Sequence, residues 1–181
     1  MPPVQQPGLS AGSRDDTEVR EPRMSGTLVI GLGNSLRGDD GVGMRIAALL
    51  TSQTLPEGIE VAQGGTPGLE LVNWMEGWQR VIIIDAADVG RQPGEFLRFT
   101  LDEGYLLGDD QHLSIHAAGL RDALLLVEVL GTLPKEVIVY GVQPAHLDWV
   151  DALSPEVEQA IPRILRAVLG ELGTPSLATH T

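Results

Sequence analysis

Short runs of apolar, mostly β-branched residues alternate with segments of helical periodicity, and this alternation restricts the fold more than any other feature. The run Val81–Ile84 is continuous, which is typical of a strand buried on both faces of a parallel sheet. Further strands are expected at Thr27–Gly31, Ile59–Ala62 and Val137–Val142. The segment Glu95–Thr100 alternates more openly, which predicts an edge or antiparallel strand.

Apolar residues at helical spacing separate these strands. Helices are expected within residues 41–52, around residues 69–75, over Ala117–Leu130, and from Ser154 to about Leu169. Ser154 is the predicted N-cap of the last helix. Strands that alternate with helices predict an α/β fold, here a three-layer sandwich whose mostly parallel, twisted sheet of about five strands is flanked by helices.

The two ends of the chain differ in composition from its middle. Residues 1–25 are rich in Pro, Gly, Ser and charge without an apolar period, which predicts a disordered leader, and residues 173–181 are expected to form a disordered tail. Residues 26–172 are predicted to form a single α/β domain. The leader lacks the basic start and apolar run of a secretory signal, so a cytoplasmic location is expected.

Charge and cysteine content exclude several classes of function. The 181 residues include 25 acidic and 12 basic side chains, for a net charge of −13. This charge argues against binding to nucleic acid or to an anionic membrane surface, and no apolar stretch is long enough to predict a transmembrane helix. The absence of cysteine excludes thiol nucleophiles, disulfides and thiolate metal sites. A metal site in this chain therefore has to use carboxylates, imidazole, water or a partner's ligands.

A glycine-rich turn, GLGNSLRGDDGVG, joins the first strand to the first helix. Gly31 and Gly33 match the start of a dinucleotide-binding fingerprint, but Leu36 occupies its third glycine position. The carboxylates of Asp39 and Asp40 stand where a pyrophosphate would approach, and like charges repel. No nucleotide cofactor is expected. The acidic pair itself is open to two interpretations, helix capping or ligand binding.

Two further polar residues follow strand and helix signals. Asp85 ends the run Val81–Ile84 and is expected in the crevice at the carboxyl end of the sheet, although a strand-end Asp also commonly caps a turn. His116 falls in the first turn of the predicted third helix, where the helix dipole favours neutral imidazole. Together with Asp40, these residues predict an N/O site for a borderline divalent metal on one rim of the sheet. A metal-assisted hydrolase or a metal-sensing module is consistent with such a site.

Five segments in order make the chain from about Leu28 to Leu169 resemble the hydrogenase maturation proteases, the endopeptidases of [NiFe]-hydrogenase assembly. These segments are GLGNSLRGDDGVGMR, GGTPGLEL, VIIIDAADVGRQPGEFLRF, SIHAAGLRDAL and VIVYGVQP. The resemblance implies removal of a C-terminal extension from the hydrogenase large-subunit precursor after nickel insertion. It also implies that the nickel is supplied by the precursor.

Within this resemblance, the carboxylates and the histidine that contact the precursor's nickel fall on Asp40, Asp85 and His116, with Asp40 expected to act as the catalytic base. The segment Gly64, Gly65 and Thr66 is expected to make a tight turn at the same rim, with Thr66 available to a bound peptide. Gln63 departs from the family, because many relatives have Asp there. Two alternatives stay open. One is a different α/β metallohydrolase that holds its own metal, and the other, which Gln63 keeps open, is a non-catalytic factor that checks nickel or binds the large subunit.

Overall fold

A computed structural model describes residues 26–66, 68, 70–101 and 118–174. The strands are β1 (Thr27–Leu32), β2 (Ile59–Gly65), β3 (Arg80–Ala86), β4 (Phe96–Thr100) and β5 (Glu136–Val142). The helices are the 3-10 turn η1 (Gly38–Gly41) and the α-helices α1 (Val42–Thr51), α2 (Glu70–Met75), α3 (Ala118–Val129) and α4 (Pro155–Glu171). This order confirms the predicted alternation of strands and helices.

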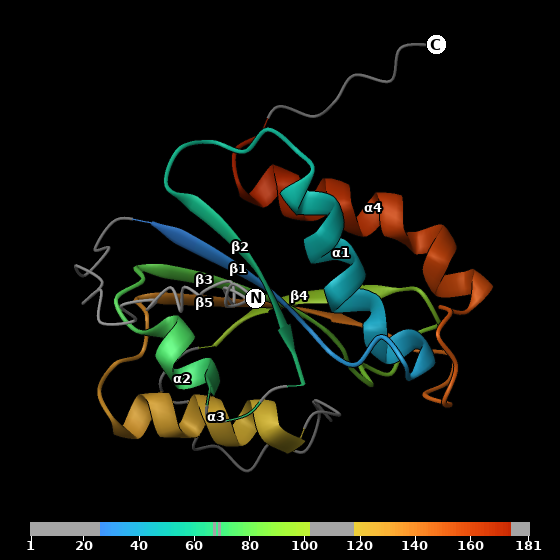
Figure 1. Cartoon of the computed structure of the whole chain (residues 1–181), viewed down its shortest axis with the longest axis horizontal. Helices are drawn as coiled ribbons and strands as arrows, with labels where there is room; N and C mark the ends of the chain where they lie inside the picture. Colours follow the sequence, from blue (N-terminus) through green and yellow to red (C-terminus); the bar gives the residue numbers. More distant parts are fainter. Residues whose placement is uncertain (1–25, 67, 69, 102–117, 175–181) are drawn as a thin grey trace, which may run out of the picture.

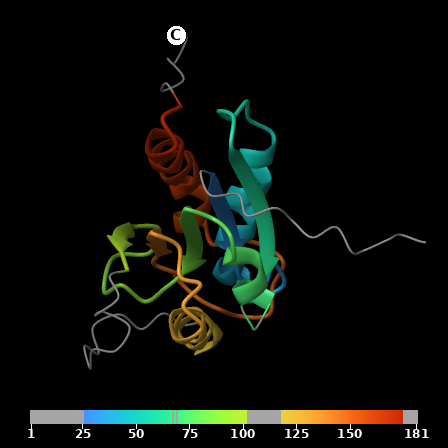
Figure 2. The ribbon, with the colours of Figure 1, turned by 90° about the vertical axis from the view of Figure 1, so that its left-hand side faces the viewer.

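The five strands form one sheet in the order β2-β1-β3-β5-β4. The neighbours among β1, β2, β3 and β5 pair in parallel, and β4 pairs antiparallel with β5. Figure 2 shows β2 and β4 at opposite edges of the sheet. The prediction of a mostly parallel sheet with an antiparallel edge strand is therefore confirmed.

Helices cover both faces of the sheet, α1 and α4 on one and α2 and α3 on the other (Figure 1). Successive residues of a strand point to opposite faces, so the continuous apolar run of β3 fills two cores. Ile82 and Ile84 pack in the core with α1 and α4, whereas Val81 and Ile83 pack in the core with α2 and α3. This arrangement confirms the three-layer sandwich, and explains why the strand is apolar without interruption.

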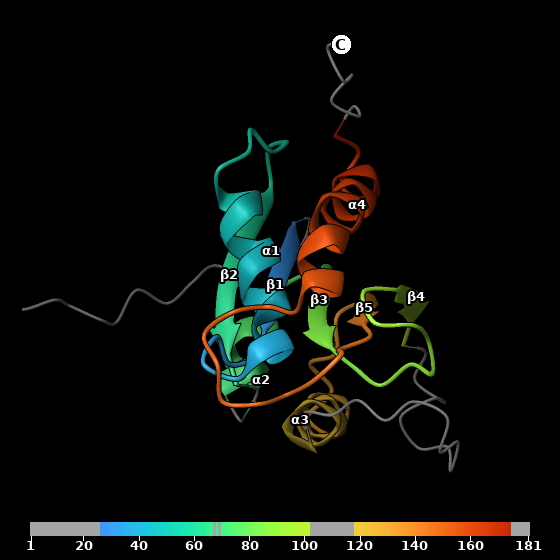
Figure 3. The ribbon, with the colours of Figure 1, turned by 90° about the vertical axis from the view of Figure 1, so that its right-hand side faces the viewer.

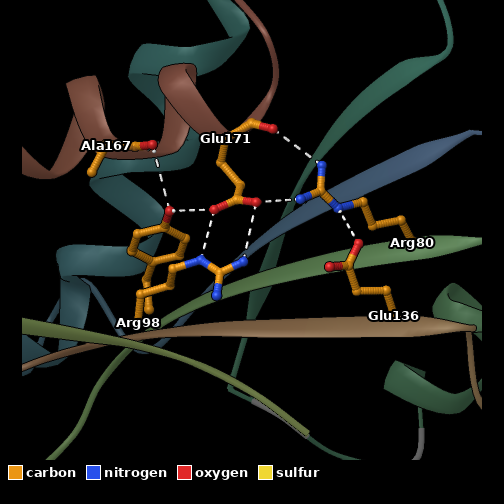
Figure 4. Close-up of polar contacts among 6 residues, drawn as sticks. Arg80, Arg98, Glu136, Ala167 and Glu171 are labelled. Atoms are coloured by element: carbon orange, nitrogen blue, oxygen red, sulfur yellow. Dashed lines mark hydrogen bonds and ion pairs between the residues drawn. The ribbon is translucent and has the colours of Figure 1, made fainter.

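Charged and polar side chains fix the C-terminal end of α4 to three strands (Figure 4). The Glu171 carboxylate accepts hydrogen bonds from Arg98 Nε at 2.7 Å and from the Tyr140 hydroxyl at 3.2 Å, and it pairs with Arg80. Arg80 also pairs with Glu136 at 2.7 Å. The hydrogen bond from Arg98 lowers the pKa of Glu171, and burial is the main cause that raises the pKa of Tyr140 to about 12. The network, formed by Arg80, Arg98, Glu136, Tyr140 and Glu171, thus joins α4 to β3, β4 and β5.

Helix α1 begins in direct contact with the ends of two strands, at Gly43. A Cβ atom at Gly43 would lie 2.2 Å from the carbonyl oxygen of Ile84 and 2.4 Å from that of Leu32. Backbone atoms on both sides cannot move aside, so only glycine allows this approach. The contact brings the turn that precedes α1 onto the end of β3.

We expect Gly43→Ala to lower the free energy of unfolding by about 3 kcal/mol, because the added methyl group forces α1 away from the sheet. Gly170→Ala is the matched control, since a Cβ there meets nothing within 4 Å and Gly170 lies inside α4. That substitution should raise stability by about 0.5–1 kcal/mol through the higher helix propensity of alanine. Urea unfolding of both variants measures the difference. Equal stabilities for the two would contradict the close contact at Gly43.

No helix among the residues that the structure describes is long and apolar enough to cross a membrane.

Candidate active site

The turn between β1 and α1 lies at the carboxyl end of the sheet (Figure 3), and Asp40 belongs to this turn. Gly33 has a φ of +113°, and a Cβ there would overlap the Asp40 carbonyl oxygen at 1.7 Å. The turn closes on itself, because the Asn34 amide donates a hydrogen bond to Asp40 Oδ2 at 2.9 Å. Asp40 is half-buried in η1, so one of its carboxylate oxygens is held by the backbone at the rim.

Asp85 lies in β3 at the same end of the sheet and is 1% exposed. Its Oδ2 atom has no hydrogen-bond partner among the described residues. The pKa of Asp85 is raised from 3.8 to about 8, mainly by burial and also by the negative charge of Asp40, while a hydrogen bond with the Ala86 backbone opposes the shift. Asp85 is therefore mainly protonated at neutral pH.

The electrostatic effect of Asp40 on Asp85 agrees with the prediction that the two carboxyl groups gather at one rim. The third predicted member, His116, lies outside the described residues, two positions before the first residue of α3. Within the described ranges, no three His, Asp or Glu side chains are grouped so that they could hold a metal ion. The complete triad of Asp40, Asp85 and His116 stays a prediction.

Asp39, next to Asp40, neither caps a helix nor lies open to a ligand, the two roles considered for the acidic pair. It is fully buried, and its carboxylate accepts hydrogen bonds from the amides of Ala145 (2.8 Å), His146 (3.3 Å) and Ser154 (2.7 Å) and from the Ser154 hydroxyl (2.9 Å). The helix-capping interpretation is wrong, because Gly41 precedes α1 and neither aspartate makes a side-chain cap bond there. Asp39 instead ties the turn to the segment between β5 and α4.

The predicted turn at Gly64, Gly65 and Thr66 is corrected in part. Gly64 and Gly65 are the last residues of β2, and Thr66 follows in a bend, exposed. The strand continues past Ala62 because β1 also continues: the pairing shifts from Gly31 with Gln63 to Leu32 with Gly65. The role of this segment in binding peptide stays a prediction.

Gln63 lines a hollow beside the candidate site. The hollow has a volume of about 240 Å³ and lies between η1, the start of α1, the end of β2 and the segment before α4. Ser35, Gly41 and Asp151 are among its other lining residues. An uncharged amide therefore occupies the position where the resemblance leads one to expect a carboxylate.

Gln143 follows β5, and its side chain binds the backbone of an earlier segment. Its Oε1 atom accepts hydrogen bonds from the amides of Val89 at 2.9 Å and Arg91 at 3.2 Å. These contacts fix the chain directly after Asp85 to the end of β5. The sequence offers only a weak signal for this role, a glutamine that follows a buried strand. Nothing in the local sequence indicates that its partners lie about 50 residues earlier.

Comparisons with known proteins agree with this geometry. A sequence profile of the hydrogenase maturation proteases matches residues 44–171. The chain belongs to the hydrogenase maturation protease family. It is 34% identical over 146 residues to the hydrogenase 2 maturation protease of Escherichia coli, covering 80% of this chain and 89% of the relative. It is also 36% identical over 151 residues to the hydrogenase expression/formation protein HupD of Bradyrhizobium diazoefficiens, covering 81% of this chain and 79% of the relative.

Solved structures show the same relationship. The hydrogenase maturating endopeptidase HybD from E. coli superposes with a TM-score of 0.71 and 32% identity, covering 82% of this chain and 92% of that one. A hydrogenase 2 maturation peptidase from a thaumarchaeon gives a TM-score of 0.65 at 33% identity, covering 82% and 99%. The fold, the family and the peptidase class expected from the sequence are thereby confirmed. The profile of the hydrogenase maturation proteases covers Asp85 but begins after Asp40.

Proposed function

We propose that this protein is the endopeptidase that removes the C-terminal extension of a nickel-loaded [NiFe]-hydrogenase large-subunit precursor. In this proposal the precursor's nickel is contacted by Asp40, Asp85 and His116. The related maturation proteases support the reaction class.

The observation that carries the proposal is the buried carboxyl group of Asp85, which has an oxygen unsatisfied among the described residues and stands close enough to Asp40 to be affected by its charge. Asp85 is buried with a carboxyl oxygen that no described residue hydrogen-bonds, and the charge of Asp40 acts on it. A buried carboxyl group with an unsatisfied oxygen reduces stability, and a second negative charge nearby adds to that cost. A divalent cation would relieve both effects, because it attracts the two carboxylates and favours their charged forms. The pair is therefore suited to a cation that arrives with the substrate.

Two roles for the substrate's nickel follow from this arrangement. In the first, the nickel polarises the scissile carbonyl or lowers the pKa of a bound water, and Asp40 accepts the proton of that water. In the second, the nickel is only a recognition signal that positions the peptide, and the carboxyl groups themselves catalyse cleavage of the peptide bond. Both roles need an open carboxylate oxygen of Asp40 at the rim. Among the described residues, the hydrogen bond to this carboxylate is the one from the Asn34 amide to Oδ2.

We expect the wild-type protein to shorten the nickel-loaded precursor and to leave the nickel-free precursor intact. Asp40→Asn should reduce the rate at least about 100-fold, because an amide neither attracts nickel nor accepts a proton from water. His116→Gln should reduce it as well. Asp122→Asn is the matched control, because Asp122 is exposed on α3, and its rate should equal that of the wild type. Intact-mass spectrometry of the large subunit over time measures each rate.

Three outcomes would contradict the proposal, each in a different way. Equal cleavage of nickel-free precursor would remove nickel from the reaction. Binding of the precursor without shortening would indicate a non-catalytic factor, the alternative that Gln63 suggests. Stoichiometric zinc or manganese in the purified protein, together with hydrolysis of unrelated substrates, would indicate a metallohydrolase with its own metal.

A further inference from the structure

An exposed apolar patch lies beside the candidate active site. Leu36 is 59% exposed, Trp149 is 75% exposed and Val150 is 43% exposed. Leu36 belongs to the turn after β1, whereas Trp149 and Val150 belong to the segment between β5 and α4. The remaining large apolar side chains that are exposed in the described part of the chain, Val129 and Leu130, lie at the end of α3 on the opposite rim. We call Leu36, Trp149 and Val150 the rim patch.

The rim patch is held in place although it is exposed. The Gly38 amide donates a hydrogen bond to the Val150 carbonyl oxygen at 2.7 Å, which joins its two segments. The Arg37 guanidinium lies 5.5 Å from the centre of the Trp149 ring, within cation–π range. Figure 3 shows the segment between β5 and α4 passing beside the turn after β1, where Asp39 fixes it. The patch is therefore preorganised, so a partner that binds it does not have to order it first.

The fold gains little from an exposed tryptophan. A side chain that is 75% exposed removes little apolar surface from water. Tryptophan and arginine are, however, the residues that contribute most often to the binding energy of protein–protein interfaces. The cation–π pair of Arg37 and Trp149 therefore consists of the residue types that are common at the centre of protein–protein interfaces.

The patch is continuous with the candidate active site. Arg37 and Gly38 directly precede Asp39 and Asp40 in the chain. The hollow of about 240 Å³ borders both, since its lining includes Gly41, the neighbour of Asp40, and Ser35 and Asp151, the neighbours of patch residues. A protein substrate whose scissile bond reaches Asp40 and Asp85 therefore has the rim patch beside it.

We propose that the rim patch is the docking surface for an apolar part of the hydrogenase large-subunit precursor, next to the bond that is cleaved. This inference rests on the proposed function for the identity of the partner. Docking on the patch raises the affinity for the whole precursor, while the chemical step depends on the carboxyl groups at the rim.

The test compares Trp149→Ala with Val129→Ala, a matched exposed apolar residue on the far rim, using nickel-loaded precursor and the full-length protein. We expect Trp149→Ala to raise KM about tenfold with kcat within about twofold of wild type, since loss of an interface tryptophan commonly costs at least this much affinity. Trp149→Phe should restore part of the loss. Val129→Ala should leave both constants unchanged.

An unchanged KM for Trp149→Ala, or a loss confined to kcat, would overturn the docking surface while wild-type cleavage still supports the proposed function. If the wild type does not cleave, the same variants are compared for equilibrium binding of the nickel-loaded precursor. Weaker binding by Trp149→Ala alone then supports docking without the proposed activity, and absent or equal binding refutes docking. A wild-type dimer that Trp149→Ala dissociates in analytical ultracentrifugation would also overturn the proposal, because a second copy would then cover the patch.

Discussion

Asp85→Asn is expected to reduce cleavage of the nickel-loaded precursor by at least about 100-fold and to make the folded protein more stable near pH 8. The first effect follows from the proposed function, because an amide in place of the carboxylate removes a negatively charged contact to the nickel. The second follows from burial. Asp85 is 1% exposed and has an oxygen that no described residue hydrogen-bonds, so its charged form is costly in the folded state and its asparagine variant avoids that cost.

The stability effect has a definite dependence on pH. Burial raises the pKa of Asp85 from 3.8 to about 8, so between these values the folded protein retains a proton that the unfolded chain has lost. The contribution of Asp85 to stability therefore falls as the pH rises from about 4 to about 8, and is constant above that. The asparagine variant does not titrate. Its melting temperature should equal that of the wild type near pH 4.5 and exceed it by roughly 5 °C or more at pH 8.

Differential scanning calorimetry at the two pH values measures this difference, and intact-mass spectrometry measures cleavage. Asp88→Asn is the control, because Asp88 is exposed three residues further along, where its side chain accepts a 3.2 Å hydrogen bond from the Gly90 amide. It should change neither cleavage nor the pH dependence. A difference in melting temperature between Asp85→Asn and wild type that does not vary with pH would show that Asp85 is not buried in the manner described.

The second large effect is expected from Asp39→Asn, which should lower the free energy of unfolding by about 2–4 kcal/mol. The Asp39 carboxylate accepts four hydrogen bonds, three of them at its Oδ2 atom. An asparagine has an NH₂ group in place of one of the two carboxylate oxygens. That group faces hydrogen-bond donors instead of accepting from them, which leaves buried amides unsatisfied. The segment between β5 and α4 should then separate from the turn that holds Asp40, and cleavage should fall together with stability.

Ser154→Ala provides a graded comparison. It removes one of the four hydrogen bonds to Asp39, and also the bond that Ser154 Oγ accepts from the Val157 amide at the start of α4. The expected cost is about 1–2 kcal/mol, less than that of Asp39→Asn. Urea unfolding measures both. A smaller loss for Asp39→Asn than for Ser154→Ala would mean that the carboxylate does not connect the two segments.

The sheet could be predicted because its signals are local. The continuous run in β3, the open alternation of β4 and the Ser154–Pro155 start of α4 each depend on a few neighbouring residues, and all three are found in the structure. The side-chain oxygen of Ser154 accepts from the Val157 amide, as an N-cap residue does. Local patterns of burial and capping thus determine the architecture.

The site could be predicted only in part, because its polar contacts join distant segments. Asp39 and Asp40 are adjacent in the sequence, yet the partners of Asp39 lie more than 100 residues later. No local pattern distinguishes the aspartate that these amides satisfy from the one left at the rim. The end of β2 was missed for a related reason, since Gly65 is in a strand only because Leu32 pairs with it.

The Glu171 network stabilises the fold at a place distant from the residues proposed to bind substrate. Its charged side chains hold α4 near the starts of β3 and β5, whereas Asp40, Asp85 and Trp149 all lie at the other end of the sheet. Substitutions at Leu36, Trp149 or Val150 therefore leave this anchorage intact. Under the docking proposal, a lineage of such proteases can change the hydrogenase that it processes by altering exposed rim residues, without first acquiring compensating mutations that restore folding.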